Sequence, residues 1–219
     1  MKTAGTFNKH KEPEMFKKIS ENWHKILLGI FLAEFVVLAF HPYNRVIWIT
    51  ENFFSVIIAA GFVILYKKGV RFSNLAYTLA ALYLCFHTVG GHYTFERVPF
   101  DFVTNLFGFE RNHFDRICHF MVGFFAFPAM EYLESRKLIR GRGMTAFLVI
   151  MGIFGVAAMF ELVEWIYAEL AAPDEGNAFL GSQGDIWDAQ KDMLSDGLGA
   201  MFSTALYALC RRKKISDRE

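Results

Sequence analysis

Apolar residues occur along the chain in six long runs, which short polar stretches separate. The runs cover roughly 26–40, 46–66, 72–89, 117–133, 144–170 and 186–210. A helix needs about 20 residues to cross a bilayer, and these runs reach or approach that length. The pattern therefore predicts an all-α protein, a polytopic bundle of six transmembrane helices.

The same pattern divides the chain into one membrane domain and two tails. A basic N-terminal tail covers 1–25, the membrane domain covers 26–210, and a basic C-terminal tail covers 211–219. The first apolar run is short and follows basic residues, as a signal peptide would. No small-residue cleavage pattern comes after it, so we expect a retained membrane anchor.

Composition supports the membrane interpretation. Of the 219 residues, 54% are hydrophobic and 17% are aromatic, and the 25 Phe are spread along the whole chain. The net charge of +1 gives no basic surface for nucleic acid, so the lipid bilayer is the expected partner. The three cysteines have no paired spacing, which favours neither a disulfide framework nor a zinc ribbon.

Lys and Arg residues predict the orientation of the bundle. They gather in the N-terminal tail, in the turns at 67–71 and 136–142, and in the C-terminal tail. These segments fall on one side of a six-span protein, and cytoplasmic loops carry an excess of Lys and Arg. The other side keeps Arg45, Arg97, Arg111, Arg116 and Lys191. We therefore expect a multi-pass plasma-membrane protein with both termini in the cytoplasm and with segments 90–115 and 171–185 outside.

An acidic stripe runs along the last apolar run. In the stretch GSQGDIWDAQKDMLSDGLGA, spacings of three and four place Asp185, Asp188, Asp192 and Asp196 on one face of a helix. At 1.5 Å per residue, Asp196 would lie roughly 16 Å below Asp185, near the middle of the bilayer. A charge at that depth costs about 2.5–3.5 kcal/mol on insertion scales, so the stripe should face the bundle interior.

Other predicted helices bring ionisable groups to the same outer half of the membrane. The motif DRICHF places Asp115 and His119 one helical turn apart, and FELVEW supplies Glu161 and Glu164. The third run ends in HTVGGHY, which adds His92. Buried ionisable groups must satisfy one another through protons, arginine, water or metal. Together they predict a polar pocket that opens to the outside.

Several of these residues also have a purely structural interpretation. Asp185 and Asp115 can cap helices, and His119 can be a hydrogen-bonded core histidine. Arg116 can simply neutralise one carboxylate. Helix caps do not account for the deeper carboxylates, and for those a functional pocket is the favoured interpretation.

Four motifs resemble those of the YjdF-type family of bacterial inner-membrane proteins: GGHYTFERVPF, ERNHFDRICHFMVGF, FELVEW and GSQGDIWDAQKDM. The resemblance runs from about His87 to the end of the last run, and it implies a bacterial inner-membrane location but no particular reaction. The acidic helices are similar, more loosely, to the VanZ-like family, which is associated with glycopeptide resistance. The matching positions are His92, Asp115, Arg116, His119, Glu161, Glu164, Gln183, Asp185, Asp188 and Asp192.

Residue chemistry divides these positions into three hypothetical roles. The candidate catalytic residues are carboxylates that could act as general acids or bases: Glu161, Glu164, Asp188 and Asp192. Candidate substrate-binding residues are His92, Asp115, Arg116, Gln183 and Asp185. Candidate metal ligands are His119, Asp192 and Glu161, since histidine with carboxylates suits zinc or manganese. A divalent metal is thus the cofactor to test, although no HExxH or His-x-x-x-His spacing occurs.

Three classes of function remain open on the sequence alone. The first is a metal- or carboxylate-dependent enzyme that acts on an outer-leaflet or cell-envelope substrate, such as a lipid or lipid-linked molecule. The second is a non-catalytic envelope, stress or antibiotic-resistance-associated protein whose polar cluster is structural. The third is a proton- or cation-coupled transporter. Against the transporter, the inner half of the predicted bundle offers little polar continuation apart from Glu34.

The distribution of basic residues predicts a topology that reporter fusions can test. A reporter fused after Glu219 should report a cytoplasmic location, and one inserted near Asp174 should report an external one. An external C-terminus would contradict the six-span arrangement and the depth assigned to the acidic stripe.

Overall fold

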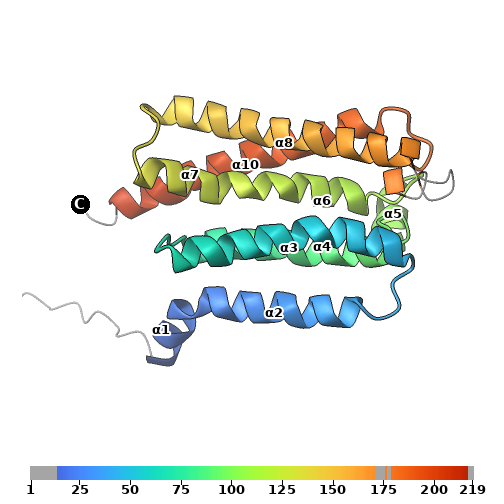
Figure 1. The fold of residues 1–219 in the computed structure, drawn as a ribbon. Helices are drawn as coiled ribbons and strands as arrows, with labels where there is room; N and C mark the ends of the chain where they lie inside the picture. Colours follow the sequence, from blue (N-terminus) through green and yellow to red (C-terminus); the bar gives the residue numbers. More distant parts are fainter. Residues whose placement is uncertain (1–13, 171–175, 177–178, 217–219) are drawn as a thin grey trace, which may run out of the picture.

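The computed structural model describes residues 14–170, 176 and 179–216, and helices dominate these residues, which contain no strand (Figure 1). The helices are α1 (Glu14–Glu21), α2 (Trp23–Leu38), α3 (Arg45–Lys67), α4 (Asn74–Tyr93), α5 (Asp101–Phe107), α6 (Phe114–Val122), η1 (Gly123–Phe125), α7 (Ala126–Ser135), α8 (Arg142–Leu170) and α10 (Asp188–Ser216). The all-α prediction is confirmed. Parts of both predicted tails, and Asp174, lie outside the described residues.

Three of these helices are long and apolar enough to cross a membrane: α3, α8 and the Asp188–Arg212 part of α10. The prediction of a helical membrane protein is therefore confirmed. That the chain crosses the membrane six times stays a prediction. Many large apolar side chains are exposed on the outside of the bundle, among them Val37, Phe53 and Leu209. Such residues suit a surface whose solvent is lipid.

The fourth predicted span is interrupted in its middle. Instead of one continuous helix, α6 and α7 are joined by the single 3-10 turn η1. Pro128 has no backbone N–H, so it cannot bond the carbonyl of Phe124 four residues earlier. The Ser203 hydroxyl of α10 donates to that carbonyl at 3.5 Å. A neighbouring helix thus satisfies the acceptor that proline leaves free.

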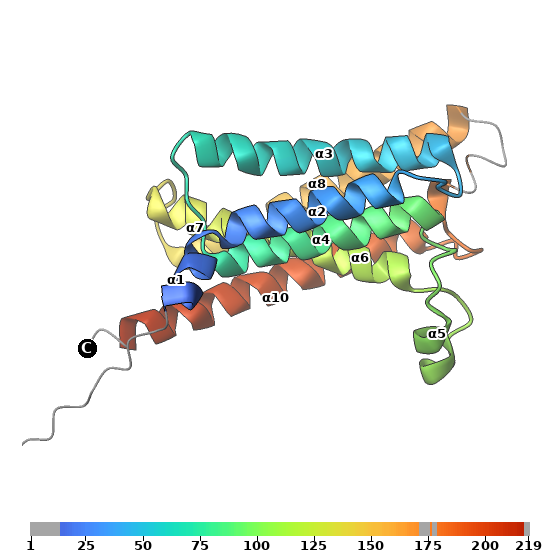
Figure 2. The same cartoon turned by 90° about the horizontal axis from the view of Figure 1, so that it is seen from below.

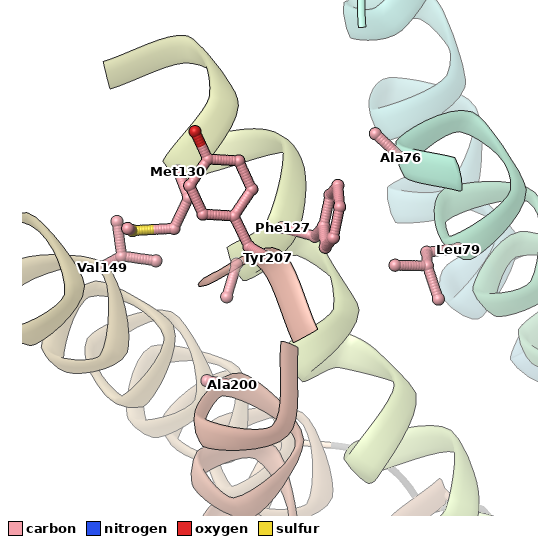
Figure 3. Close-up of a cluster of buried hydrophobic side chains, with 8 residues drawn as sticks. Ala76, Leu79, Phe127, Met130, Val149, Ala200 and Tyr207 are labelled. Atoms are coloured by element: carbon pink, nitrogen blue, oxygen red, sulfur yellow. The ribbon is translucent and has the colours of Figure 1, made fainter. Parts of the chain in front are cut away.

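The long helices run side by side, and α4 lies in the middle of the bundle (Figures 1 and 2). Helix α10 packs against α6, η1, α7 and α8, whereas α4 packs against α2, α3 and α6. Helix α5 and the end of α8 lie at one end of the bundle, and the C-terminus lies at the other. One apolar cluster, shown in Figure 3, joins α4, α7, α8 and α10. Its labelled members are Ala76, Leu79, Phe127, Met130, Val149, Ala200 and Tyr207.

Two glycines allow α10 to approach the α6–η1 segment closely. A Cβ added to Gly199 would collide with the backbone carbonyl of Phe120, and one added to Gly123 would collide with the α10 backbone around Gly199. Small residues of this kind are common where membrane helices touch. The contact holds the acidic stripe of α10 against the α6 residues that face it.

We expect Gly199→Val to destabilise the folded protein by about 1–3 kcal/mol, because the added methyl groups meet rigid backbone. Gly152→Val is the matched control, since a Cβ at Gly152 in α8 meets no atom within 4 Å. Thermal unfolding in detergent should separate the two variants. Equal midpoints would show that the helices do not depend on this contact.

Candidate functional site

Arg116 is the centre of an ion-pair network at the beginning of α10. Its guanidinium lies 3.2 Å from a carboxylate oxygen of Asp185, and it also pairs with Asp188. Its Nε lies 2.7 Å from Asp192 Oδ1, although the direction does not meet hydrogen-bond geometry. One arginine of α6 is therefore the shared ion-pair partner of three successive members of the acidic stripe.

Arg111 and Lys191 complete the outer part of this network. Arg111 lies 2.5 Å from Asp188 and donates to the carbonyl of Ser182 at 3.2 Å. Lys191 donates to Asp185 at 2.6 Å, and this hydrogen bond is the main reason why the pKa of Asp185 falls to about 2. A lowered pKa stabilises the fold above the ordinary pKa of the carboxyl, and that contribution is lost as pH falls through about 2. This ion pair is consequently intact at neutral pH.

Gln183 joins the segment before α10 to the segment before α6 through the backbone. Its Oε1 accepts from the backbone N–H of Asn112 at 2.9 Å, and its Nε2 donates to the carbonyl of the same residue at 3.0 Å. The Asn112 side chain donates to the carbonyls of Glu96 and Val98. Gln183 thus holds the chain before α10 to the chain before α6, next to the ion-pair network.

His119 lies deeper in the bundle, between two carboxylates. Its Nδ1 is 3.2 Å from Asp196 Oδ2, and its Nε2 is 3.7 Å from Asp115 Oδ1. With the proton on Nδ1 and donated to Asp196, the lone pair of Nε2 is directed to the side of Asp115. Asp115, His119 and Asp192 each offer one ligand atom, and these atoms lie within 4.8 Å of one another.

Two carboxylate oxygens at this depth have no hydrogen-bond partner in the described part of the chain. They are Oδ1 of Asp192, which has the Arg116 guanidinium 2.7 Å away in a direction that is not a hydrogen bond, and Oδ1 of Asp196; the two residues are only 3% and 1% exposed. A buried acceptor without a partner carries a desolvation cost of about 1–3 kcal/mol, and more when it is charged. A bound cation, water or proton would remove that cost.

The His119 cluster forms one wall of a cavity of about 290 Å³ inside the bundle. Asp115, His119, Asp196 and Glu164 are among its polar lining residues. The remaining lining is largely aromatic and aliphatic, and it includes Phe95, which follows α4, and Phe179, which precedes α10. The cavity thus combines ionisable groups with a largely apolar lining.

A second acid–histidine pair lies on the α3 and α4 side of this cavity, and the sequence pointed to its His87 but missed its Glu51. His87 Nε2 is 3.5 Å from a carboxylate oxygen of Glu51, and the Ser55 hydroxyl is 3.0 Å from His87 Nδ1. Glu51 is 3% exposed, and it lines the cavity together with His87. The sequence offered one signal for this pair: Glu51 is a carboxylate within an apolar run, and Ser55 lies one turn further on the same helix face.

The remaining predicted residues are divided between the cavity and other places. Glu164 lines the cavity, and Glu161 is partly buried three residues earlier on α8; neither carboxylate makes a hydrogen bond within the described ranges. The three residues whose possible ligand atoms converge are Asp115, His119 and Asp192, and the sequence had assigned Asp115 to substrate binding instead. The role of Glu161 as a metal ligand stays a prediction. His92 lies apart from this cluster, because its Nδ1 is 2.7 Å from the carbonyl of Leu38.

Comparisons with known proteins give a family but no activity. Residues 23–213 match a family described as "Predicted membrane protein (DUF2238)". The chain is 37% identical over 168 residues to "Inner membrane protein YjdF" of Escherichia coli (strain K12), a match that covers 76% of this chain and 79% of that protein. No solved structure matches. The predicted resemblance is confirmed, and the matching family is one of predicted membrane proteins.

Replacing Arg116 should be far more harmful than replacing a surface cation of the same network. Arg116→Gln takes the guanidinium away from the buried Asp192 and leaves Asp188 with Arg111 alone, and losing one partner of a buried pair costs about 3–5 kcal/mol. Lys191→Gln is the control: its side chain is 49% exposed, and exposed pairs contribute at most about 1 kcal/mol. Thermal unfolding in detergent measures both. Similar losses for the two variants would contradict a central role for Arg116.

Proposed function

The chain belongs to the DUF2238 family of predicted membrane proteins, and from this premise we propose that it is a six-span inner-membrane enzyme with a divalent-metal site in its cavity. The substrate would come from the outer leaflet or the cell envelope. Both termini would lie in the cytoplasm, so that α5 and the beginning of α10 would be at the outer face.

The six proposed spans are α2, α3, α4, the α6–η1–α7 segment, α8 and α10. Helix α2 has 16 residues and would extend about 24 Å, which is slightly short for a hydrocarbon core of about 30 Å. A short span can be accommodated by local thinning of the bilayer at modest cost. The basic residues at 67–71 and 136–142 would then lie together at the cytoplasmic face, as the positive-inside rule requires.

The observation that carries the metal proposal is the convergence of Asp115, His119 and Asp192, whose ligand atoms lie within 4.8 Å of one another. Tetrahedral coordination with metal–ligand bonds of about 2.0–2.2 Å places ligand atoms about 3.4 Å apart, so binding would draw these side chains together by about 1 Å. Behind the histidine, Asp196 is in position to accept a hydrogen bond from Nδ1. Such a carboxylate orients a metal-bound histidine and fixes its tautomer.

The ligand types narrow the choice of ion. Two carboxylates with one imidazole suit Zn²⁺ or Mn²⁺ better than a soft thiophilic metal. Cys118 also lines the cavity, but it belongs to an apolar cluster with Val98 and Phe114. Three protein ligands would leave coordination positions free for water or substrate, as catalytic zinc sites do.

The chemistry that follows is hydrolysis. A divalent ion would supply a water of lowered pKa, about 7 in well-studied zinc sites, and would polarise the scissile group. Hydroxide would add to the electrophilic atom, the bond to the leaving group would break, and the proton released by water would go to the leaving group. Glu164, which lines the cavity, and Glu161 nearby are the carboxylates proposed to carry that proton.

The two other classes of function fit the cavity less well. A cation-coupled transporter needs a polar path through the bundle, and the inner end of this cavity is formed by Ile58, Val122, Phe125 and Ile153. A purely structural cluster would place each carboxylate beside a partner, as Arg116 does for Asp188. Asp196 has His119 beside its Oδ2, but its Oδ1 has no hydrogen-bond partner among the described residues, and Asp196 lines the cavity.

The metal proposal predicts a stoichiometric ion that depends on Asp192 and His119. Protein purified in detergent without chelator, then analysed by elemental mass spectrometry, should contain about one Zn²⁺ or Mn²⁺ per chain. Asp192→Asn and His119→Ala should lower that content at least tenfold while the protein still folds, because each variant removes a ligand without adding a buried charge.

Asp101→Asn provides the matched control, since it removes an exposed carboxylate from α5, outside the cavity. Its metal content should equal that of the wild type. Wild-type protein that binds no divalent ion, together with an Asp192→Asn variant of raised thermal stability, would reject the metal site and favour the structural interpretation.

A further inference from the structure

The cavity has two ends of different chemistry. Glu51, His87, Asp115, His119 and Asp196 make one part of its wall strongly polar. Towards the other end of the bundle, Ile58, Val122, Phe125 and Ile153 make the wall largely apolar, with the ring of Tyr83 packed on Phe125. A ligand that fills this space would have a polar group joined to an apolar chain.

Helices α3 and α8 both line the cavity, yet each packs mainly on other helices. Helix α3 packs along α4, and α8 packs along α10 and α7. Between α3 and α8 the contact rests largely on two rings, Phe54 and Phe160, which meet edge to face with centroids 5.3 Å apart. Both rings line the cavity and are only partly buried. This line between the two helices is called the α3–α8 seam below.

The cavity reaches the outside of the bundle along this seam. Val156 of α8 lines the cavity and is nevertheless 59% exposed. The side chains around the seam are exposed and apolar, among them Phe53, Ile57 and Met159. Phe54 is nine residues into α3, about 14 Å along the helix, which corresponds to the hydrocarbon region of a spanning helix. The seam would therefore face lipid chains and not water.

Entry into the cavity along the membrane normal is more restricted than entry through the seam. At the outer end of the cavity, Phe95 and Phe179 contribute to the lining, and Thr94 beside them is buried. Above them the network of Arg111, Arg116 and the aspartates ties the start of α10 to α6. Aromatic contact at the seam can be opened by rotation of two side chains, whereas opening the outer end requires ion pairs to break.

We propose that the ligand of this site is a single-chain amphiphile that enters sideways from the bilayer, between α3 and α8, with Phe54 and Phe160 as the gate. Its apolar chain would lie against Ile58 and Ile153, and its polar group would reach Asp115 and His119. A volume of about 290 Å³ is at the lower limit of about 300–1,000 Å³ for ligand pockets, which suits one chain and not a whole two-chain lipid. This inference rests on the proposed function, because it names the substrate class of the same site.

Photolabelling tests the proposal directly. The probe is lysophosphatidylglycerol with a diazirine in its acyl chain, added to the purified full chain in nanodiscs and followed by peptide mapping. Wild-type protein should acquire adducts on cavity residues such as Phe125 and Ile153, in addition to adducts on the exposed Val37 of α2, which report bulk lipid. Adducts confined to exposed positions would overturn lateral access.

Two variants on one helix separate cavity binding from surface contact. Ala157 lines the cavity and is 4% exposed, so Ala157→Trp should fill it and lower the interior adducts at least tenfold relative to the Val37 adducts. Met159 is 68% exposed two residues later, and Met159→Trp should leave both classes of adduct unchanged. Interior labelling that persists in Ala157→Trp would overturn the proposal.

A gate variant and a metal measurement complete the design. Phe160→Ala removes one ring of the gate, and the interior labelling rate should rise several-fold; an unchanged or lower rate would overturn the role of the seam. This variant remains informative if Ala157→Trp does not fold. Metal content measured on the same samples separates the two proposals: retained metal without interior adducts rejects lateral access alone, whereas absence of metal rejects the proposed function.

Discussion

Burial of charge inside the bundle is the constraint on which the rest of the structure depends. An unpaired ion in a low-dielectric interior costs several kcal/mol, so an acidic helix can be held there only with counter-charges in fixed positions. Arg116 supplies this counter-charge to Asp185, Asp188 and Asp192, and His119 continues it to Asp196. The alignment of α6 with α10 follows from these pairs, and the cavity lies beside them.

Backbone features make that alignment possible. Without Cβ atoms at Gly123 and Gly199, α10 and the α6–η1 segment come into direct backbone contact. Close approach brings the Ser203 hydroxyl to the Phe124 carbonyl, which Pro128 has left without a helical partner. The close contact between α10 and the α6–η1 segment therefore also places the carboxylates of α10 beside His119.

Much of this arrangement could be predicted from the sequence because helical periodicity is a local property. The spacing of Asp185, Asp188 and Asp192 placed them on one face, and the pair Asp115 and His119 followed from a four-residue spacing. Glu51 could not be assigned in this way, because its relation to His87 depends on how α3 packs against α4. Likewise, the sequence grouped Glu161 with His119 and Asp192 as ligands, but whether Glu161 reaches them depends on the relative rotation of three helices, which periodicity does not give.

The separation of the ion partners along the chain has a consequence for biogenesis. Arg116 and Asp185 are 69 positions apart, so ribosomes complete α6 long before they begin α10. Until α10 is inserted, the arginine has none of its aspartate partners, and the nascent chain carries an uncompensated cation at the membrane. Docking of the last helix supplies several partners at once. Assembly of the bundle is therefore cooperative at its final step, and a chain truncated before α10 would carry a charge pattern that quality-control proteases can distinguish from the finished protein.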